Sequence, residues 1–136
     1  MREKLKIQYL ITIAATLCVC LILVAFLLRP QPLQIGAVHL GAVADGSYIG
    51  VCQNKILFAV VQVEIRDHKI TGIEVIEHKA SYMAQAEQIA GAVCSKQSLE
   101  VDAISGATLT SDTVLKAIEN ALSDAERSSD GKWVFQ

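Results

Sequence analysis

Several patterns that define common redox proteins are missing from this chain of 136 residues. It has no G-x-G-x-x-G segment after a strand, which nicotinamide-binding domains use to hold the pyrophosphate. It also has no C-x-x-C-H sequence for haem and no cysteine set for an iron–sulfur cluster. Aromatic residues make up only 5% of the chain and there are two prolines, although 52% of the residues are hydrophobic. This composition excludes collagenous, coiled-coil, repeat and disordered proteins.

Charged residues are absent from a run of 22 residues at positions 7–28. At about 1.5 Å per residue, a helix of this length crosses a bilayer core of roughly 30 Å. Arg2, Lys4 and Lys6 precede the run, so the positive-inside rule places residues 1–6 in the cytoplasm and the rest of the chain outside. The sequence therefore predicts a single-pass protein of the cell membrane with an extracytoplasmic domain.

The alternative for this run is a cleaved signal peptide, whose apolar region usually has 7–15 residues and is followed closely by a site of small residues. The good match to such a site, Ala42-Val43-Ala44, lies far beyond the run. Lipoprotein processing is disfavoured because Leu17 stands where a small residue should precede Cys18. We therefore expect an uncleaved anchor that contacts the lipid bilayer.

The part of the chain after Arg29 is acidic, with eight Lys or Arg and 13 Asp or Glu residues and a net charge of −5. This balance argues against nucleic acid as a partner and against a polybasic membrane patch. Cys52 and Cys94 lie in this part, where oxidising conditions permit a disulfide, but the sequence does not show whether they pair. No His or Cys spacing indicates a metal site.

Three segments of different character follow the anchor. Residues 29–44 contain both prolines and no clean period, which predicts a spacer between the membrane and a domain of residues 45–125. Residues 126–136 form a polar tail that ends in an apolar patch. Trp133 and Phe135 of this patch are expected to dock on their own domain or to contact a partner.

Apolar and polar residues alternate at positions 58–65 and again at positions 70–78, the pattern of half-buried strands. Asp67 and His68 lie between the two runs, which predicts an antiparallel hairpin with His68 as a turn residue. Residues 47–52 are expected to form an earlier strand.

Apolar residues recur at helical spacing in residues 84–95 and 111–125, which predicts two helices. Thr110 or Ser111 is expected to cap the second helix, with Asp112 in its first turn. The predicted fold is therefore α+β: a small antiparallel sheet with two packed helices, preceded by one N-terminal transmembrane helix.

Four hydroxyl-bearing residues and a glycine lie in residues 105–111, directly before the second predicted helix. A glycine with small neighbours permits close backbone approach, and the unpaired N–H groups of a helix N-terminus favour a phosphate. A Ser/Thr-rich turn that only caps the helix fits the same composition equally well.

The segment Asp102-Ala103-Ile104-Ser105-Gly106-Ala107-Thr108 resembles the flavinylation motif Asp-x-x-(Ser/Thr)-Gly-Ala-Thr of the FMN-binding domain family. This family includes the flavin-bearing small subunits of the Rnf complex and of sodium-translocating NADH:quinone reductase. The resemblance extends through DGSYIG at positions 45–50, the predicted hairpin and the helix after the motif, and so covers residues 45–125.

The resemblance implies that FMN is joined through its phosphate to the hydroxyl of Thr108. A flavin transferase, which uses FAD and a divalent metal, makes this bond in the family and would recognise Asp102. The cofactor-binding residues implied here are Asp102, Ser105, Gly106, Ala107, Thr108, Thr110 and Ser111.

The sequence departs from the family after the predicted hairpin, where many members have a Thr-Pro-Gly-type loop near the flavin. Here the chain continues from Glu77 to Met83 without that loop. His78, Tyr82 and Met83 are therefore only candidates for contacts with the flavin ring. A surface histidine at a strand end and ordinary packing of Tyr82 and Met83 remain open alternatives.

One redox centre without a visible substrate domain is typical of an electron carrier or of a subunit of an oxidoreductase complex, more than of a stand-alone enzyme. The resemblance implies FMN on Thr108 and a membrane electron-transport partner. The alternative is a non-redox binding or sensor module of the same fold, in which Thr108 is unmodified.

Overall fold

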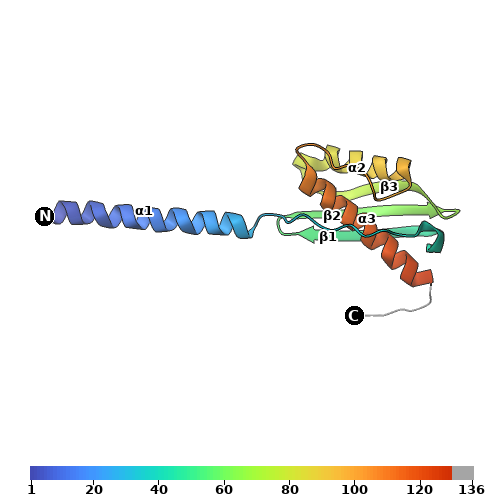
Figure 1. Cartoon of the computed structure of the whole chain (residues 1–136), viewed down its shortest axis with the longest axis horizontal. Coiled ribbons are helices and arrows are strands. Elements are labelled where there is room, and N and C mark those ends of the chain that lie inside the picture. Colours follow the sequence, from blue (N-terminus) through green and yellow to red (C-terminus); the bar gives the residue numbers. More distant parts are fainter. Residues whose placement is uncertain (130–136) are drawn as a thin grey trace.

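The computed structural model of the chain describes residues 1–129, and Trp133 and Phe135 lie outside these residues. A long N-terminal helix leads into a domain made of a three-stranded antiparallel sheet and two further helices (Figure 1). This arrangement confirms the predicted α+β class. In chain order the elements are α1 (Arg2–Leu27), η1 (Leu40–Ala42), β1 (Gly46–Asn54), β2 (Leu57–Arg66), β3 (Lys69–His78), η2 (Ala80–Tyr82), α2 (Met83–Lys96) and α3 (Thr108–Ser129).

Helix α1 has the length and composition of a membrane-crossing helix, with a mean hydropathy of 2.9 over its most apolar window and no residue buried by the rest of the protein. Its two threonine hydroxyls are paired within the helix: that of Thr12 donates to the carbonyl of Tyr9, and that of Thr16 to the carbonyl of Ile13, each at 2.9 Å. Such internal pairing is what a hydrocarbon environment requires. Both a membrane anchor and a signal sequence have these properties.

The strands follow each other in the order β1-β2-β3. The predicted β2–β3 turn is confirmed, because Asp67 and His68 have φ of 53° and 58°, as a two-residue hairpin turn with right-handed strand twist requires. The amide of His68 also donates to Oδ1 of Asp45 at 3.3 Å. Hydrogen bonds from the backbone of Asp67 and His68 hold the pKa of the Asp45 carboxyl below its usual value.

Two register shifts interrupt the pairing of β2 with β3 and leave Thr71 and Ile76 as the extra residues on β3. A bulge changes which face of the sheet the following residues occupy. His78 consequently lies on the covered face beside Ala59 and is only 6% exposed. The surface position considered for His78 from the sequence is therefore wrong, because simple alternation along β3 does not hold.

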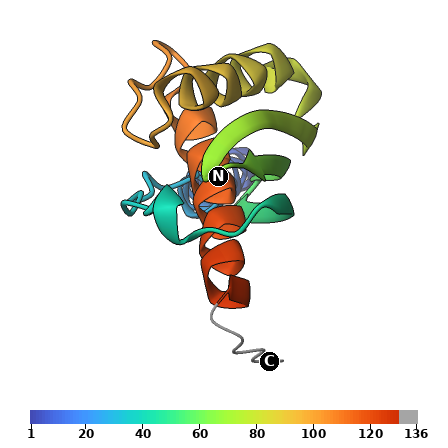
Figure 2. The same cartoon turned by 90° about the vertical axis from the view of Figure 1, so that its right-hand side faces the viewer.

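Helices α2 and α3 cover one face of the sheet, with α2 against β3 and α3 against β1 and β2 (Figure 2). The apolar stripes predicted for the two helices form much of the core, which confirms the helical period in both segments. The buried helical residues include Ala86, Ile89, Ala90, Val93, Val114, Leu115, Ile118 and Leu122.

Helix α3 lies very close to the sheet at Gly50 of β1. A Cβ atom at this position would lie 1.9 Å from the carbonyl oxygen of Ala117 and 2.7 Å from the backbone nitrogen of Ala121. Glycine at position 50 and alanine at two positions of α3 therefore let the helix backbone lie directly on the strand. This contact sets the height of α3 above β1.

Residues 29–44 do not form the expected spacer but run along the domain, on the side of α3 away from the strands (Figure 2). The backbone of Gln31 exchanges two hydrogen bonds with the side-chain amide of Asn54, of 3.1 and 2.6 Å. Farther along, the amide of Gly36 donates to Oε2 of Glu119 at 3.0 Å. The partly buried residues of this segment are Leu33, Ile35, Val38 and Leu40.

These apolar residues contact the domain individually and follow neither a helical nor a strand period. Irregular spacing gives no periodic signal in the sequence, which is why the segment resembled a spacer. Val43 at its end is fully buried in the core, so the segment belongs to the domain.

The contact at Gly50 predicts that Gly50→Ala destabilises the domain. Because the added methyl would meet helix backbone, which cannot give way, we expect the free energy of unfolding to fall by about 3 kcal/mol. The matched control is Gly72→Ala on β3, where the added atom has only Glu64 Oε2 within 4 Å, at 3.9 Å, and where we expect a change below about 0.5 kcal/mol. Pulse proteolysis of the full chain in urea measures both, and equal losses would contradict the assigned contact.

The pair formed by Gln31 and Asn54 predicts that Asn54→Ala releases the chain next to α1. The amide of Gln31 loses its acceptor, and we expect its hydrogen exchange to accelerate about tenfold, the factor that corresponds to roughly 1.4 kcal/mol for one hydrogen bond. Exchange mass spectrometry of the full chain measures this change. Gln53→Ala, at the exposed neighbouring position, should leave the Gln31 amide protected; a Gln31 amide that exchanges rapidly in the native chain would contradict the pairing.

Candidate functional site

A cavity of about 420 Å³ lies among residues of the loop before α3, the β1–β2 turn and the segment after β3. These segments are at the end of the domain nearest to α1 (Figure 1). Strands β1 and β3 end there, β2 begins there and α3 starts there. A cavity of this size is within the range of small-molecule sites. Its lining residues are Pro30, Ile56, Leu57, Lys79, Tyr82, Gly106, Ala107, Thr108, Leu109 and Thr110.

Helix α3 begins at Thr108, three residues before the predicted start. Its first backbone hydrogen bond runs from the amide of Ser111 to the carbonyl of Ala107 at 2.9 Å. The amides of Thr108, Leu109 and Thr110 precede this bond and have no acceptor among the described residues. Unpaired amides of this kind, with the positive end of the helix dipole, favour an anion.

The predicted capping roles in α3 are wrong because the helix starts earlier. Ser111 lies within the helix, fully buried, and its hydroxyl donates to the carbonyl of Ala107 at 2.9 Å and accepts from the amide of Ile104 at 3.2 Å. It therefore fastens the loop before α3 to the helix. Thr110 is also buried inside the first turn, and Asp112 lies beyond it.

Gly106 in the loop and Thr108 at the first position of α3 leave the start of the helix open. Gly106 has a φ of 79°, where L side chains are strained, and a Cβ there would have open space around it. Thr108 is exposed and lines the cavity, and its hydroxyl has no hydrogen-bond partner among the described residues. A free hydroxyl therefore lies beside the three unpaired amides.

The residues implied by the motif do not all reach the cavity. Gly106, Ala107, Thr108 and Thr110 line it. Asp102 and Ser105 are exposed in the preceding loop and do not line it. Ser111 does not line it either, because its side chain is buried and hydrogen-bonded to the backbone of that loop.

Of the three candidates for ring contacts, Tyr82 lines the cavity, and the ammonium group of Lys79 lies 5.8 Å from the centre of its ring. Met83 and His78 do not line it. Nδ1 of His78 donates to the carbonyl of Phe58. Nε2 of His78 and Oε1 of Gln85 are buried without a partner among the described residues.

Sequence reasoning missed Pro30, Ile56, Leu57 and Lys79 as cavity residues. Pro30 was assigned to a spacer, and Leu57 lies just before the strand predicted for residues 58–65. Ile56 carried one usable signal in the sequence, because it is a large apolar residue directly after the predicted turn at Asn54 and Lys55. In the structure its side chain is 54% exposed.

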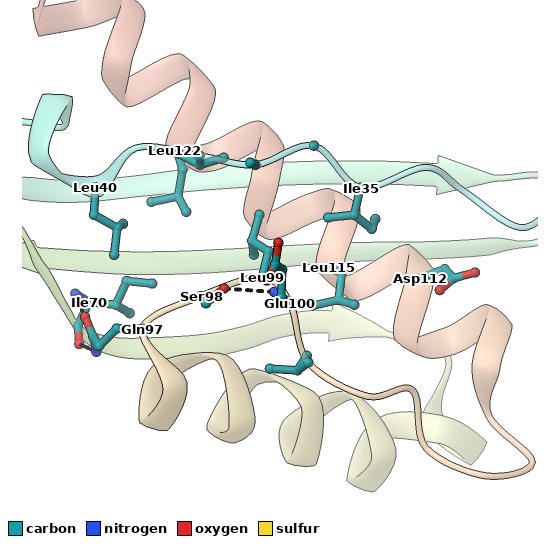
Figure 3. Close-up of a pocket in the computed structure, with 14 residues that line it drawn as sticks. Ile35, Leu40, Ile70, Gln97, Ser98, Leu99, Glu100, Asp112, Leu115 and Leu122 are labelled. Atoms are coloured by element: carbon teal, nitrogen blue, oxygen red, sulfur yellow. Dashed lines mark hydrogen bonds between the residues drawn. The ribbon is translucent and has the colours of Figure 1, made fainter.

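A second cavity, of about 360 Å³, lies between residues 35–40, α3 and the loop after α2 (Figure 3). Leu99, Leu115 and Leu122 give it an apolar wall, while Glu100 and Asp112 add carboxylates. It shares no lining residue with the cavity at Thr108. The free hydroxyl and the unpaired amides therefore belong to the Thr108 cavity alone.

Cys52 and Cys94 are free thiols. Cys52 lies on β1, where burial raises the pKa of its thiol, and Cys94 lies on α2, where its Sγ donates to the carbonyl of Ile70 at 3.7 Å. Among residues 1–129, no three His, Cys, Asp or Glu side chains come together as metal ligands.

The family model of the FMN-binding domain matches residues 58–123, a stretch that includes β2, β3, α2 and the start of α3 at Thr108. The domain that follows α1 belongs to the FMN-binding domain family. The crystal structure of the CPE2226 protein from Clostridium perfringens is similar in fold, with a TM-score of 0.52 and 23% identity over 63% of this chain and 91% of that chain. No curated protein matches this chain.

The Thr108 cavity fits FMN. The unpaired amides of Thr108, Leu109 and Thr110 suit the phosphate, and Gly106 leaves open space beside them. Tyr82 and the apolar side chains of Ile56 and Leu57 supply surfaces for an aromatic ring system. The start of the helix thus suits the phosphate end of FMN, and the apolar wall suits its ring system.

The fastening of the loop predicts that Ser111→Ala destabilises the start of α3. The partly buried amide of Ile104 would lose its acceptor, and we expect the free energy of unfolding to fall by about 1–3 kcal/mol. Thr113→Val is the matched control, since the Thr113 hydroxyl donates only to the Leu109 carbonyl at 2.7 Å within the helix; it should cost less than about 1 kcal/mol. Urea pulse proteolysis reports both, and a harmless Ser111→Ala would show that the loop is held in another way.

Proposed function

We infer that this chain is a membrane-anchored, extracytoplasmic flavoprotein that carries FMN covalently on Thr108 and relays electrons. The observation that supports this most directly is the position of Thr108. Thr108 is the first residue of α3 and lines the cavity. Its exposed hydroxyl lies next to three unpaired backbone amides. It is also the last residue of the segment that resembles the flavinylation motif.

Attachment by a flavin transferase would form a bond between Oγ of Thr108 and the phosphorus of the FMN half of FAD. The phosphorus–oxygen bond to the AMP half breaks, AMP leaves, and the hydroxyl proton passes to a base of the transferase. The product is a phosphodiester with one negative charge. The start of α3 stabilises that charge, because its amides and the helix dipole both face it.

Covalent attachment suits a domain outside the cell, where a dissociable cofactor would be lost by dilution. FMN supplies one- and two-electron redox chemistry through its ring, which attachment through the phosphate leaves unmodified. The role of the protein is then to hold the ring against Tyr82 and the apolar wall. Helix α1, with Arg2, Lys4 and Lys6 at its N-terminal end, would keep the domain outside and close to a membrane electron-transport partner.

The proposal predicts that the full chain, co-expressed with a flavin transferase, gains the mass of one FMN minus one water. Thr108→Ala should lose this mass completely because it removes the only attacking atom. Thr108→Ser should restore at least part of it, since the hydroxyl is kept. Intact-mass spectrometry measures all three.

The matched control is Ser105→Ala, which removes an exposed hydroxyl three residues away and should leave the added mass unchanged. An unmodified native chain, with the transferase shown to be active on another substrate, would contradict the covalent carrier. It would favour the non-redox binding module instead. Retention of residues 1–28 in the measured mass tests the anchor independently of the flavin.

A further inference from the structure

We propose that the end of the domain around Thr108 rests on the lipid bilayer surface, so that the cavity opens at the boundary between lipid and water. We call this surface the Thr108 end and define it by Arg29, Pro30, Lys55, Ile56, Lys79 and Tyr82, which surround the cavity or directly adjoin its lining. The proposal rests on the inferred anchoring by α1. It adds an orientation that neither the anchor nor the cofactor requires.

The first argument is the short and fixed connection to α1. The helix ends at Leu27, and Pro30, three residues later, already lines the cavity. Three residues span at most about 10 Å. Gln31 is then held by two hydrogen bonds to Asn54 at the end of β1. The domain therefore has no free tether on which to move away from the membrane or turn this end outward (Figure 1).

The second argument is the chemistry of the Thr108 end. Ile56, at the tip of the β1–β2 turn, is 54% exposed, and Tyr82 is 36% exposed. Lys55 precedes Ile56, and Lys79 lies over the ring of Tyr82. Apolar and aromatic side chains beside long cationic ones are typical of surfaces at a membrane interface, where the rings enter the headgroup region and the ammonium groups meet lipid phosphates.

The third argument is the distribution of charge. The part of the chain after Arg29 has a net charge of −5, so an anionic lipid surface repels most of the domain. Arg29, Lys55 and Lys79 lie at the Thr108 end, against Glu77 on the neighbouring strand. Three cations of a domain that is acidic overall thus lie at the end that faces the bilayer, while other cations, Arg66 and Lys69 among them, lie elsewhere on the domain.

The opposite end of the sheet also has cationic side chains but lacks the large apolar ones. Its turn consists of Asp67 and His68, flanked by Arg66 and Lys69, and none of these is a large apolar residue. Lys69 begins β3 and His78 ends it, so the two ends lie about 30 Å apart along the strand. A site at Lys69 therefore reports on a surface that should stay out of reach of lipid.

Photocrosslinking tests this orientation. The full chain, without FMN, carries p-benzoylphenylalanine in place of Ile56 and is reconstituted in vesicles of phosphatidylcholine and phosphatidylglycerol. After irradiation, intact mass measures the fraction of chain that has gained a lipid. The matched control places the same group at Lys69. We expect at least tenfold more lipid adduct from position 56 than from position 69, and a severalfold loss at position 56 in the double variant Lys55→Glu and Lys79→Glu.

Equal adducts from the two positions, or none from position 56, would overturn the proposal. Crosslinked dimers at position 56 would also overturn it, since a second copy of the chain would then cover this end. Because FMN is left out, a failure of flavinylation at Thr108 does not affect the result. A chain whose mass shows that α1 has been removed would instead contradict the anchor itself.

Discussion

The close approach of α3 to β1 at Gly50 determines where the candidate site of this domain lies. The helix lies so near the strand that its backbone takes the place of a side chain, and its direction across the sheet follows from this contact. Its first residue, Thr108, consequently lies where β1 and β3 end. A larger residue at position 50 would move the helix and with it the unpaired amides that suit a phosphate.

A second constraint holds the other wall of the site. Gln31 is bound to Asn54, which brings Pro30 into the lining of the cavity and leaves Ile56 at its rim. The cavity is thus built from the segment that leaves α1, one hairpin turn and one helix start. These parts are distant in sequence, and they meet in a single site at the end of the domain next to α1.

The sequence predicted those features that depend on local periodicity or on turn chemistry. Alternation in residues 58–65 and 70–78 indicated the hairpin, and Asp67 with His68 indicated its tight turn; the structure confirms both. Helical spacing identified the residues of α2 and α3 that form the core. The hydroxyl-rich segment of residues 105–111, which includes the first turn of α3, was located for the same reason, since it directly precedes a strong amphipathic pattern.

What the sequence did not predict depends on tertiary contacts. The bulge at Ile76 turns His78 inward, and no local pattern marks that change. The start of α3 at Thr108 follows from the buried hydroxyl of Ser111, which holds the amide of Ile104; from the sequence, the same hydroxyl suggested a cap. Residues 29–44 contact the domain through irregularly spaced side chains. The sequence therefore carried no sign that Pro30 forms part of the lining of the Thr108 cavity.

The most direct test of the account is peptide mapping of the flavin-loaded chain after denaturation. Trypsin should release residues 97–116 as one peptide, since Lys96 and Lys116 flank it and no Lys or Arg lies between them. The account predicts that this peptide carries FMN and that fragmentation places the group on Thr108, although Ser105, Thr110 and Ser111 are in the same peptide. FMN on another residue, or flavin released by denaturation alone, would contradict it.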